Sequence, residues 1–248
     1  MSKTCIVVTG ASKGIGASIA VALAEQGHYV ACLSRSGTVP KVEGISAEVD
    51  ARLLAGRADV SQPETMAQAL KQLKDDGWTI KGLVNNAGLH VDGPSATLPL
   101  DQWQLMMDMN ATSVLTACQA AYPYLLENQG GMIVNIGSFF EKLGVKRNVA
   151  YCASKAAVGA ITRCLAAEWG NKGIRVMNVA PGYIETDLNA DAMGEDSPLR
   201  QYLAKRIPGG VPGKSKDVGA LVASMFGPAG AFLSGETIYI DGGQSIAH

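Results

Sequence analysis

The sequence has little of what a metal site or a disulfide framework needs. Its histidines are His28, His90 and His248, and no spacing of cysteine and histidine matches a zinc site, so we expect no bound metal. We assign none of the three histidines a catalytic role. The five cysteines are an odd number and lie scattered in apolar segments, which predicts buried, reduced thiols.

Long apolar runs are also missing. No stretch is long enough to span a bilayer, and the start of the sequence, MSKTCIVVTG, lacks the long apolar core and the cleavage site of a signal peptide. We therefore expect a protein of the cytoplasm with no membrane partner. Positive and negative charges nearly cancel, with 21 lysines and arginines against 22 acids and a net charge of −1, so no nucleic-acid partner is expected.

What the sequence does have is a regular alternation of apolar β-branched runs with helical patterns. Strands are predicted at 5–9, 29–34, 53–60, 82–85, 132–138, 174–180 and 237–240, and helices at 17–26, 63–76, 103–128, 150–171 and 216–226. Ser61 and Glu64 have the spacing of a capping box for the second helix. The alternation predicts an α/β fold with one domain over residues 1–248, in which a doubly wound parallel sheet has helices on both faces. Residues 37–50 are hard to assign, and the long polar stretch 184–213 suggests a substrate lid.

A glycine-rich turn joins the first strand to the first helix. It reads Gly10-Ala11-Ser12-Lys13-Gly14-Ile15-Gly16. Glycines allow a tight turn and close approach of the backbone to a pyrophosphate, which then lies on the N-terminus of the helix. Turns use glycine anyway, but between a buried strand and a helix this spacing predicts a dinucleotide-binding loop.

The second predicted strand ends without the acid that holds ribose hydroxyls in NAD-binding units of this kind. Ser34 and Arg35 stand there instead. An arginine suits a 2′-phosphate through paired, charge-assisted hydrogen bonds, and Lys13 in the glycine loop could reach the same phosphate. The alternative is that both are solvated surface cations. The two together favour NADP(H).

Tyr151 and Lys155 are four residues apart in a predicted helix, which places both side chains on one face. An ammonium beside a phenol favours the phenolate and lowers the phenol pKa, so such a tyrosine can exchange a proton near neutral pH. The alternative is an ordinary surface pair. Of the seven tyrosines, only Tyr151 has a lysine at this spacing.

With these motifs and their order, the sequence resembles the short-chain dehydrogenase/reductase family over essentially the whole chain. The glycine signature stands at residues 9–16, Asn-Asn-Ala-Gly at 85–88, and Pro-Gly at 181–182. The resemblance implies a Rossmann-type fold, NADPH and hydride transfer to a carbonyl of a small-molecule substrate. The catalytic residues it implies are Asn110, Ser138, Tyr151 and Lys155. The cofactor-binding residues are Gly10, Ser12, Lys13, Gly14, Ile15, Gly16, Ser34, Arg35, Asp59, Val60, Asn86, Ala87, Gly88, Tyr151, Lys155, Pro181, Gly182, Ile184 and Thr186.

Each catalytic residue has an implied role. Tyr151 would protonate the carbonyl oxygen, and Ser138 would hold that oxygen by a hydrogen bond. Lys155 would lower the Tyr151 pKa and bind the nicotinamide ribose, and Asn110 would hold a water that links Lys155 to solvent. Asp59 and Val60 would contact the adenine.

The strings PGYIET and GETIYIDGG resemble the 3-oxoacyl-[acyl-carrier-protein] reductases, which implies a 3-oxoacyl thioester as substrate. A predicted apolar pocket would use Phe139, Phe140, Val145, Tyr183 and Leu188. A basic loop of Lys142, Lys146 and Arg147 suits a phosphate-bearing carrier arm, or is only solvated. Gln129 and Lys172 stand where such reductases often have arginines, which leaves docking of a carrier protein in doubt.

Other functions remain open at this point. Another small alcohol or ketone could be the substrate of an NADP(H)-dependent dehydrogenase. A non-catalytic NADP-binding sensor could share the fold, although sensors have no need of the tyrosine. Sugar-nucleotide epimerases and dehydratases are longer and have another glycine spacing. The resemblance also implies pairing of the helices at 103–128 and 150–171 into a homotetramer, through small residues at Ala153, Ala156, Ala157 and Ala160.

Overall fold

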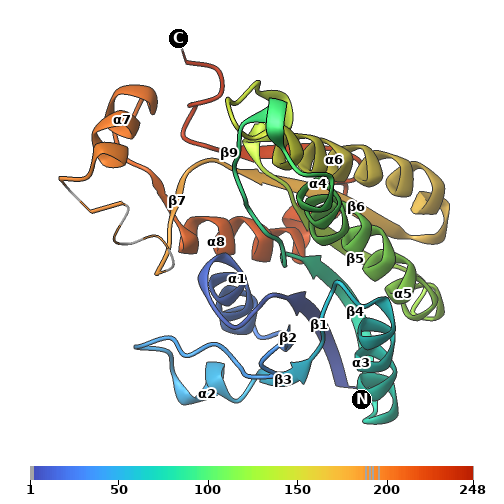
Figure 1. The fold of residues 1–248 in the computed structure, drawn as a ribbon. Helices are drawn as coiled ribbons and strands as arrows, with labels where there is room; N and C mark the ends of the chain where they lie inside the picture. The colour runs from blue at the N-terminus through green and yellow to red at the C-terminus, as the bar shows by residue number, and fades with distance from the viewer. Residues whose placement is uncertain (1–2, 188, 190, 192, 195, 248) are drawn as a thin grey trace.

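The structure is a computed structural model that describes residues 3–187, 189, 191, 193–194 and 196–247. Within these residues, seven parallel strands form one sheet in the order β3-β2-β1-β4-β5-β6-β9 (Figure 1). Their bounds are Lys3–Thr9 (β1), Tyr29–Ser34 (β2), Leu53–Arg57 (β3), Trp78–Asn85 (β4), Gly131–Ile136 (β5), Ile174–Pro181 (β6) and Thr237–Ile240 (β9). The strand order reverses between β1 and β4, so the sheet is doubly wound and the predicted fold class is confirmed.

Helices cover both faces of the sheet (Figure 1). One face packs against α1 (Gly14–Glu25) and α8 (Ser215–Met225), and the other against α3 (Pro63–Asp75), α5 (Ser113–Glu127) and α6 (Val149–Trp169). Each face of the sheet has its own hydrophobic core, because successive side chains of a strand point to opposite faces. In β1, Ile6 and Val8 belong to the core under α1 and α8, and Cys5 and Val7 belong to the core under α3, α5 and α6. Full burial of one such side chain stabilises the fold by about 1.5–3 kcal/mol.

Several boundaries differ from the predictions. The strand predicted to reach residue 60 ends at Arg57, and the capping box is wrong. Ser61 donates its hydroxyl hydrogen bond to Asp59 Oδ1 at 2.7 Å, and α3 begins after Gln62 without a side-chain cap. The helix begins one residue later than the predicted capping box requires, so Gln62 rather than Ser61 occupies the N-cap position.

The long helix predicted at 103–128 is interrupted. It consists of α4 (Leu100–Met107), a π-helical turn (Asp108–Thr112) and α5. Such turns add one residue to the helix and recur at functional sites, and this one holds Asn110 in the interior.

The two segments that sequence patterns left irregular contain short elements. In 37–50, α2 (Ala47–Asp50) begins where Ser46 Oγ accepts a hydrogen bond from Val49 N at 3.2 Å. The stretch 184–213 contains β7 (Ile184–Glu185) and α7 (Pro198–Arg206), and β7 pairs with β8 (Gly213–Lys214). In Figure 1, α7 (orange) projects from the body of the molecule.

The five cysteines all lie in the described residues and are free thiols. Burial raises the pKa of Cys5, Cys32 and Cys118 to about 12, so these thiols are unreactive. Cys152 is half-buried and Cys164 is exposed, which corrects the expectation that all five are buried. In the described part of the chain, no helix is long and apolar enough to cross a membrane, and no three metal-ligating side chains come together.

Candidate active site

The centre of the site is the point where the strand order reverses. Thr9, the last residue of β1, accepts hydrogen bonds at Oγ1 from Asn86 N at 3.0 Å and Ala87 N at 3.1 Å. The Asn86 side chain returns a hydrogen bond to Thr9 O at 3.0 Å. These bonds join the exits of β1 and β4, the position at which doubly wound sheets bind ligands.

The glycine loop lies against this junction. Gly10 and Gly14 have positive φ angles of 65° and 59°, which favour glycine. A Cβ atom on Gly16 would overlap the Gly10 carbonyl and the Asn86 amide. The helix α1 then begins after Lys13 without a side-chain cap, so its first backbone amides are available to a phosphate group. The loop therefore fits a dinucleotide.

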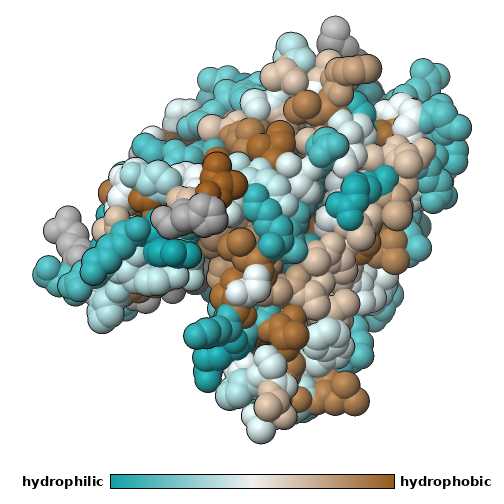
Figure 2. All heavy atoms as spheres, turned by 90° about the horizontal axis from the view of Figure 1, so that it is seen from above, coloured by the Kyte–Doolittle hydropathy of each residue, from teal (hydrophilic) through white to brown (hydrophobic). Residues whose placement is uncertain are grey.

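A cavity of about 920 Å³ opens at this edge of the sheet. Most predicted site residues line it: Gly10, Ser12, Lys13, Gly14, Ile15, Gly16, Ser34, Arg35, Asp59, Val60, Asn86, Ala87, Gly88, Ser138, Tyr151, Gly182, Ile184 and Thr186. Asn110, Lys155 and Pro181 do not reach its wall. Sequence reasoning missed other lining residues, namely Ser36, Thr38, Ala58, His90, Met109, Asn189 and Met193. Figure 2 views the molecule from above and shows hydrophobic residues (brown) along a hollow with hydrophilic residues (teal) at its outer edges.

One end of the cavity carries a row of hydroxyl groups beside Arg35. Ser34 is buried, its Oγ accepts a hydrogen bond from Gly37 N at 3.1 Å, and it lies 3.1 Å from Ser36 Oγ. Ser36 Oγ is in turn 2.8 Å from Thr38 Oγ1. Hydroxyl groups and a guanidinium are donors that a phosphate accepts. The serine-rich run after the second strand was the signal that could have identified this cluster.

Asp59 is the acid on this part of the wall. A hydrogen bond from the Ser61 hydroxyl lowers the pKa of Asp59, assisted by the Ser61 backbone amide and by the charge of Arg35. The backbone of Asp59 is held as well, because its N–H donates to Thr65 Oγ1 at 2.9 Å. Asp59 is therefore ionised and fixed in place.

The candidate proton donor lies at the other end. Tyr151 is in the first turn of α6, and Ser138 precedes the short 3₁₀ helix Phe139–Lys142, where its Oγ accepts a hydrogen bond from Phe140 N at 3.2 Å. Burial raises the pKa of Tyr151, and a hydrogen bond with Ser138 acts in the opposite direction. The predicted lowering of this pKa by Lys155 is therefore wrong in this structure.

The position of Lys155 explains why the pKa of Tyr151 is raised rather than lowered. Its Nζ donates to Ile136 O at 2.8 Å and lies 5.8 Å from the centroid of the Tyr151 ring. Burial lowers the pKa of Lys155 to about 8, and the charge of Glu141 partly opposes this. The ammonium is directed at the end of β5 rather than at the phenol. It lies behind Gly88, where a Cβ atom would be 3.6 Å from Nζ.

Asn110 ties the end of β4 to α6. Its Oδ1 accepts a hydrogen bond from Leu89 N at 2.7 Å, and its Nδ2 donates to Leu89 O at 2.8 Å and to Ser154 Oγ at 3.1 Å. The Ser154 hydroxyl donates to Tyr151 O at 2.8 Å. The π-helical turn thus supports the turn of α6 that carries Tyr151. The predicted water at Asn110 stays a prediction.

Comparison with known proteins agrees with this geometry. A family model described as enoyl-(acyl carrier protein) reductase matches residues 10–245. The 3-oxoacyl-[acyl-carrier-protein] reductase FabG of Staphylococcus aureus is 32% identical over 98% of this chain and 98% of the relative. 3beta-hydroxysteroid dehydrogenase 1 of Eggerthella lenta is 33% identical over 97% of this chain and 93% of the relative. This chain belongs to the short-chain dehydrogenase/reductase family.

Two solved structures show the same fold. A putative short-chain alcohol dehydrogenase from Sinorhizobium meliloti is 34% identical, covers 100% of this chain and 98% of its own, and has a TM-score of 0.88. A gluconate 5-dehydrogenase from Burkholderia cenocepacia, solved in complex with NADP and tartrate, is 28% identical over 99% of this chain and 96% of its own, with a TM-score of 0.87. The names of these relatives cover several substrates, so membership of the short-chain dehydrogenase/reductase family leaves the substrate open.

Aromatic rings line the cavity beside Tyr151. Phe139 and Tyr183 have ring centroids 5.7 Å apart, and Phe140 and Tyr151 5.9 Å apart. These phenylalanines and Tyr183 line the cavity as predicted, whereas Val145 does not. Leu188, the remaining predicted pocket residue, lies outside the described residues.

Part of the predicted basic loop is paired. Arg147 Nε lies 3.1 Å from Asp92 Oδ2, and Lys142 Nζ lies 3.6 Å from the centroid of the Tyr239 ring. An ion pair and a cation–π contact leave less positive potential for an anionic carrier arm than three solvated cations would.

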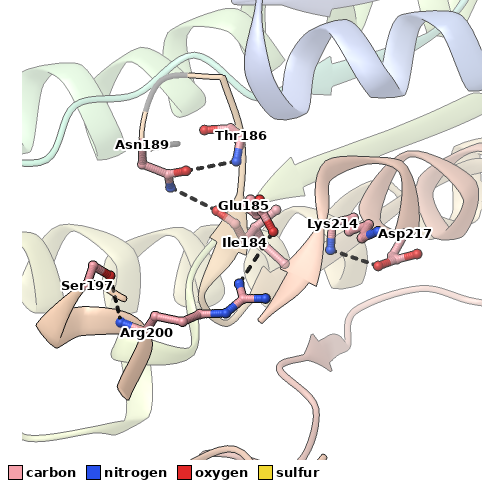
Figure 3. Close-up of polar contacts among 8 residues, drawn as sticks. All are labelled: Ile184, Glu185, Thr186, Asn189, Ser197, Arg200, Lys214 and Asp217. Atoms are coloured by element: carbon pink, nitrogen blue, oxygen red, sulfur yellow. Dashed lines mark hydrogen bonds and ion pairs between the residues drawn. The ribbon is translucent and has the colours of Figure 1, made fainter. Parts of the chain in front are cut away.

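The segment after β6 is anchored beside the cavity (Figure 3). Asn189 Oδ1 accepts a hydrogen bond from Thr186 N at 2.8 Å, and Asn189 Nδ2 donates to Ile184 O at 2.9 Å. Farther along, Arg200 Nη1 lies 3.5 Å from Glu185 Oε2. Ile184, Thr186 and Asn189 all line the cavity, so these bonds shape one of its walls.

The buried ammonium should make stability depend on pH. The pKa of Lys155 is about 8 in the folded chain and about 10.5 in the unfolded chain, so between these pH values the unfolded chain holds the extra proton. The cost of burying Lys155 is complete below pH 8 and disappears as the pH rises toward 10.5. Lys155→Met removes the titration. Urea unfolding between pH 7 and 10 should show its advantage over wild type falling by up to ~3 kcal/mol. Lys146→Met, at an exposed lysine, is the control, and a pH-independent difference for Lys155→Met would contradict the prediction.

Proposed function

We propose that this member of the family is an NADPH-dependent reductase that converts a ketone into a secondary alcohol. One observation carries the proposal: the glycine loop and the Ser138–Tyr151 pair lie on one continuous cavity. Lys155 and Asn110 support that pair from behind its wall. The arrangement can hold a cofactor and a carbonyl side by side, with a proton donor at the carbonyl.

The residues divide the work of the reaction. The nicotinamide, when bound, would supply a hydride to the carbonyl carbon, and NADPH would thereby become NADP⁺. Ser138 donates a hydrogen bond to the carbonyl oxygen and orients it. Tyr151 gives its proton to that oxygen as the carbon–oxygen π bond breaks, which completes the alcohol. Burial raises the pKa of Tyr151 and so keeps the phenol protonated and ready to donate. Lys155, whose ammonium donates to Ile136 O, holds the start of α6 and with it Tyr151 in position.

The cofactor site is divided in the same way. We assign the pyrophosphate to the glycine loop and the 2′-phosphate to Ser34, Arg35 and Lys13. The adenine would lie against Asp59 and Val60. The remaining contacts, with the ribose, the nicotinamide and its carboxamide, fall to Asn86, Ala87, Gly88, Tyr151, Lys155, Pro181, Gly182, Ile184 and Thr186. Two related gluconate 5-dehydrogenases were solved with NADP bound, which supports the choice of cofactor.

The substrate proposal is a 3-oxoacyl thioester. Its support is the similarity to FabG and the aromatic wall beside Tyr151. The ion pair at Arg147 and the contact of Lys142 with Tyr239 weaken the case for docking of an acidic carrier protein. The gluconate and alcohol dehydrogenases among the structural relatives keep a second candidate open, another small ketone or alcohol. We place the enzyme in the cytoplasm and assign residues 184–213 to the substrate lid of a single domain.

Tyr151→Phe tests the chemistry. The variant keeps the ring and its packing but has no proton to give, so turnover should fall by about 10²- to 10⁴-fold. Loss of NADPH absorbance with acetoacetyl-CoA and a panel of small ketones measures turnover, and NADPH fluorescence measures binding, which should persist. Full turnover by Tyr151→Phe would remove Tyr151 from the mechanism. If wild type binds NADPH but turns over no ketone, the alternative function of a non-catalytic NADP-binding sensor is favoured.

Arg35→Ala and Ser34→Asp test the cofactor. Loss of one hydrogen bond to a charged phosphate weakens NADPH binding by about 10- to 100-fold. NADH has no phosphate there, so Arg35→Ala should affect it little. Ser34→Asp adds repulsion against NADPH and a partner for the ribose of NADH. The measurement is the ratio of kcat/KM for the two cofactors. A wild type that prefers NADH, or an unchanged ratio in Arg35→Ala, would show that these cations are only surface charges.

A homotetramer is the assembly we propose. On α6, Ala156 and Ala160 are exposed and Ala153 and Ala157 half-buried, so a face of small side chains is accessible for close helix packing. The exposed Val149 extends this face. Light scattering at micromolar concentration should give four times 25.8 kDa, and a monomer alone would rule the tetramer out.

A further inference from the structure

His90 lies beside the candidate proton donor and has no role in the chemistry described so far. It lines the same cavity, and its ring meets the ring of Tyr151 edge-on, with centroids 4.7 Å apart and planes at 77°. A side chain this close to Tyr151 is within reach of the atoms bonded to the reacting carbonyl carbon.

The protonation of the His90 ring follows from its partner. His90 Nε2 lies 2.6 Å from Asn148 Oδ1. The orientation of the Asn148 amide is set on its other side, because Nδ2 donates to Lys146 O at 2.9 Å. A flipped amide would place its oxygen against that carbonyl. Nε2 therefore carries the proton, and in the neutral imidazole Nδ1 is an acceptor.

The loop that holds this pair is strained and pinned. Arg147 is one of two non-glycine residues with positive φ among the described residues, at 67°. Its carbonyl accepts a hydrogen bond from Gly93 N at 2.8 Å, and its side chain pairs with Asp92. Strain of this kind persists where the surroundings enforce it, often at ligand sites. Both ends of the pair are thus fixed, His90 by the segment after β4 and Asn148 by the start of α6.

We propose that His90 Nδ1 accepts a hydrogen bond from a hydroxyl group on the carbon next to the reacting carbonyl, so that the site prefers hydroxyketones. This rests on the proposed carbonyl reduction, and it favours the second substrate candidate, a small ketone or alcohol, over the 3-oxoacyl thioester. His90 and Tyr151 line the same cavity with their rings in contact, so a hydroxyl next to a carbonyl held by Tyr151 would come within reach of His90. The neighbouring wall from Phe139, Phe140 and Met109 offers contacts of a different, apolar kind. A simple ketone would leave Nδ1 without a donor, and a 3-oxoacyl thioester carries no hydroxyl at that position.

The test compares 3-hydroxy-2-butanone with 2-butanone, which lacks only the hydroxyl, and with acetoacetyl-CoA. Wild type with NADPH should show a higher kcat/KM for the hydroxyketone. His90→Phe keeps an aromatic ring against Tyr151 but has no acceptor, so the ratio of hydroxyketone to ketone should fall by roughly 3- to 10-fold. His90→Gln offers an amide oxygen and should restore part of the ratio. Asn148→Ala, which frees the tautomer, should lower the ratio while His90 remains.

Lys146→Ala is the matched control. It removes an exposed side chain from the same loop but keeps the carbonyl that orients Asn148, so the ratio should stay at its wild-type value. NADPH fluorescence titration of every variant checks that the cofactor site is intact. Equal use of both ketones by wild type, or a ratio unchanged in His90→Phe, overturns the role of His90 and leaves the reductase standing. Absence of turnover with every carbonyl compound overturns both the role of His90 and the proposed reductase function.

Discussion

The burial of one ammonium group constrains the whole candidate active site. Lys155 is almost completely enclosed, and a buried charge costs folding free energy unless polar groups face it. The carbonyl of Ile136 and the charge of Glu141 meet this need. As a result, α6 cannot move relative to the exit of β5 without leaving the ammonium unpaired. The contact between Lys155 and Ile136 therefore fixes the helix on which Tyr151 lies.

Helix α6 is the element that gathers these parts. Its first turns contact three segments that are distant in the sequence: Asn148 meets His90, Ser154 meets Asn110, and Lys155 meets Ile136. Tyr151 lies within this set: its carbonyl accepts a hydrogen bond from Ser154, and its ring lines the cavity and packs against His90. A substitution at Asn148, Ser154 or Lys155 would therefore move Tyr151, even though the substituted residue need not contact a substrate.

The two ends of the cavity have different chemistry. At one end, Arg35 lies among hydroxyl groups and glycine-loop amides, which suits phosphate. At the other, Phe140 and Tyr183 give an apolar wall, and His90 adds one directional acceptor. Binding sites commonly combine apolar walls with few polar groups that fix orientation. Relatives of about 30% identity bear names for different substrates, in keeping with specificity that depends on such wall residues rather than on the shared fold.

Features with local causes could be predicted from the amino-acid sequence alone. The glycine loop follows from backbone freedom, the Tyr151–Lys155 face from helix periodicity, and the parallel sheet from alternating strands and helices. Features that depend on burial and on distant partners could be read only from the folded chain. His90 and Asn148 are 58 residues apart, and no local pattern joins them. The direction of the Tyr151 pKa and the exposure of Cys164 likewise depend on which surfaces the packed helices cover. Local pattern specifies which residues share a strand or helix face, whereas solvent access and contact across the sheet edge exist only once the chain is folded.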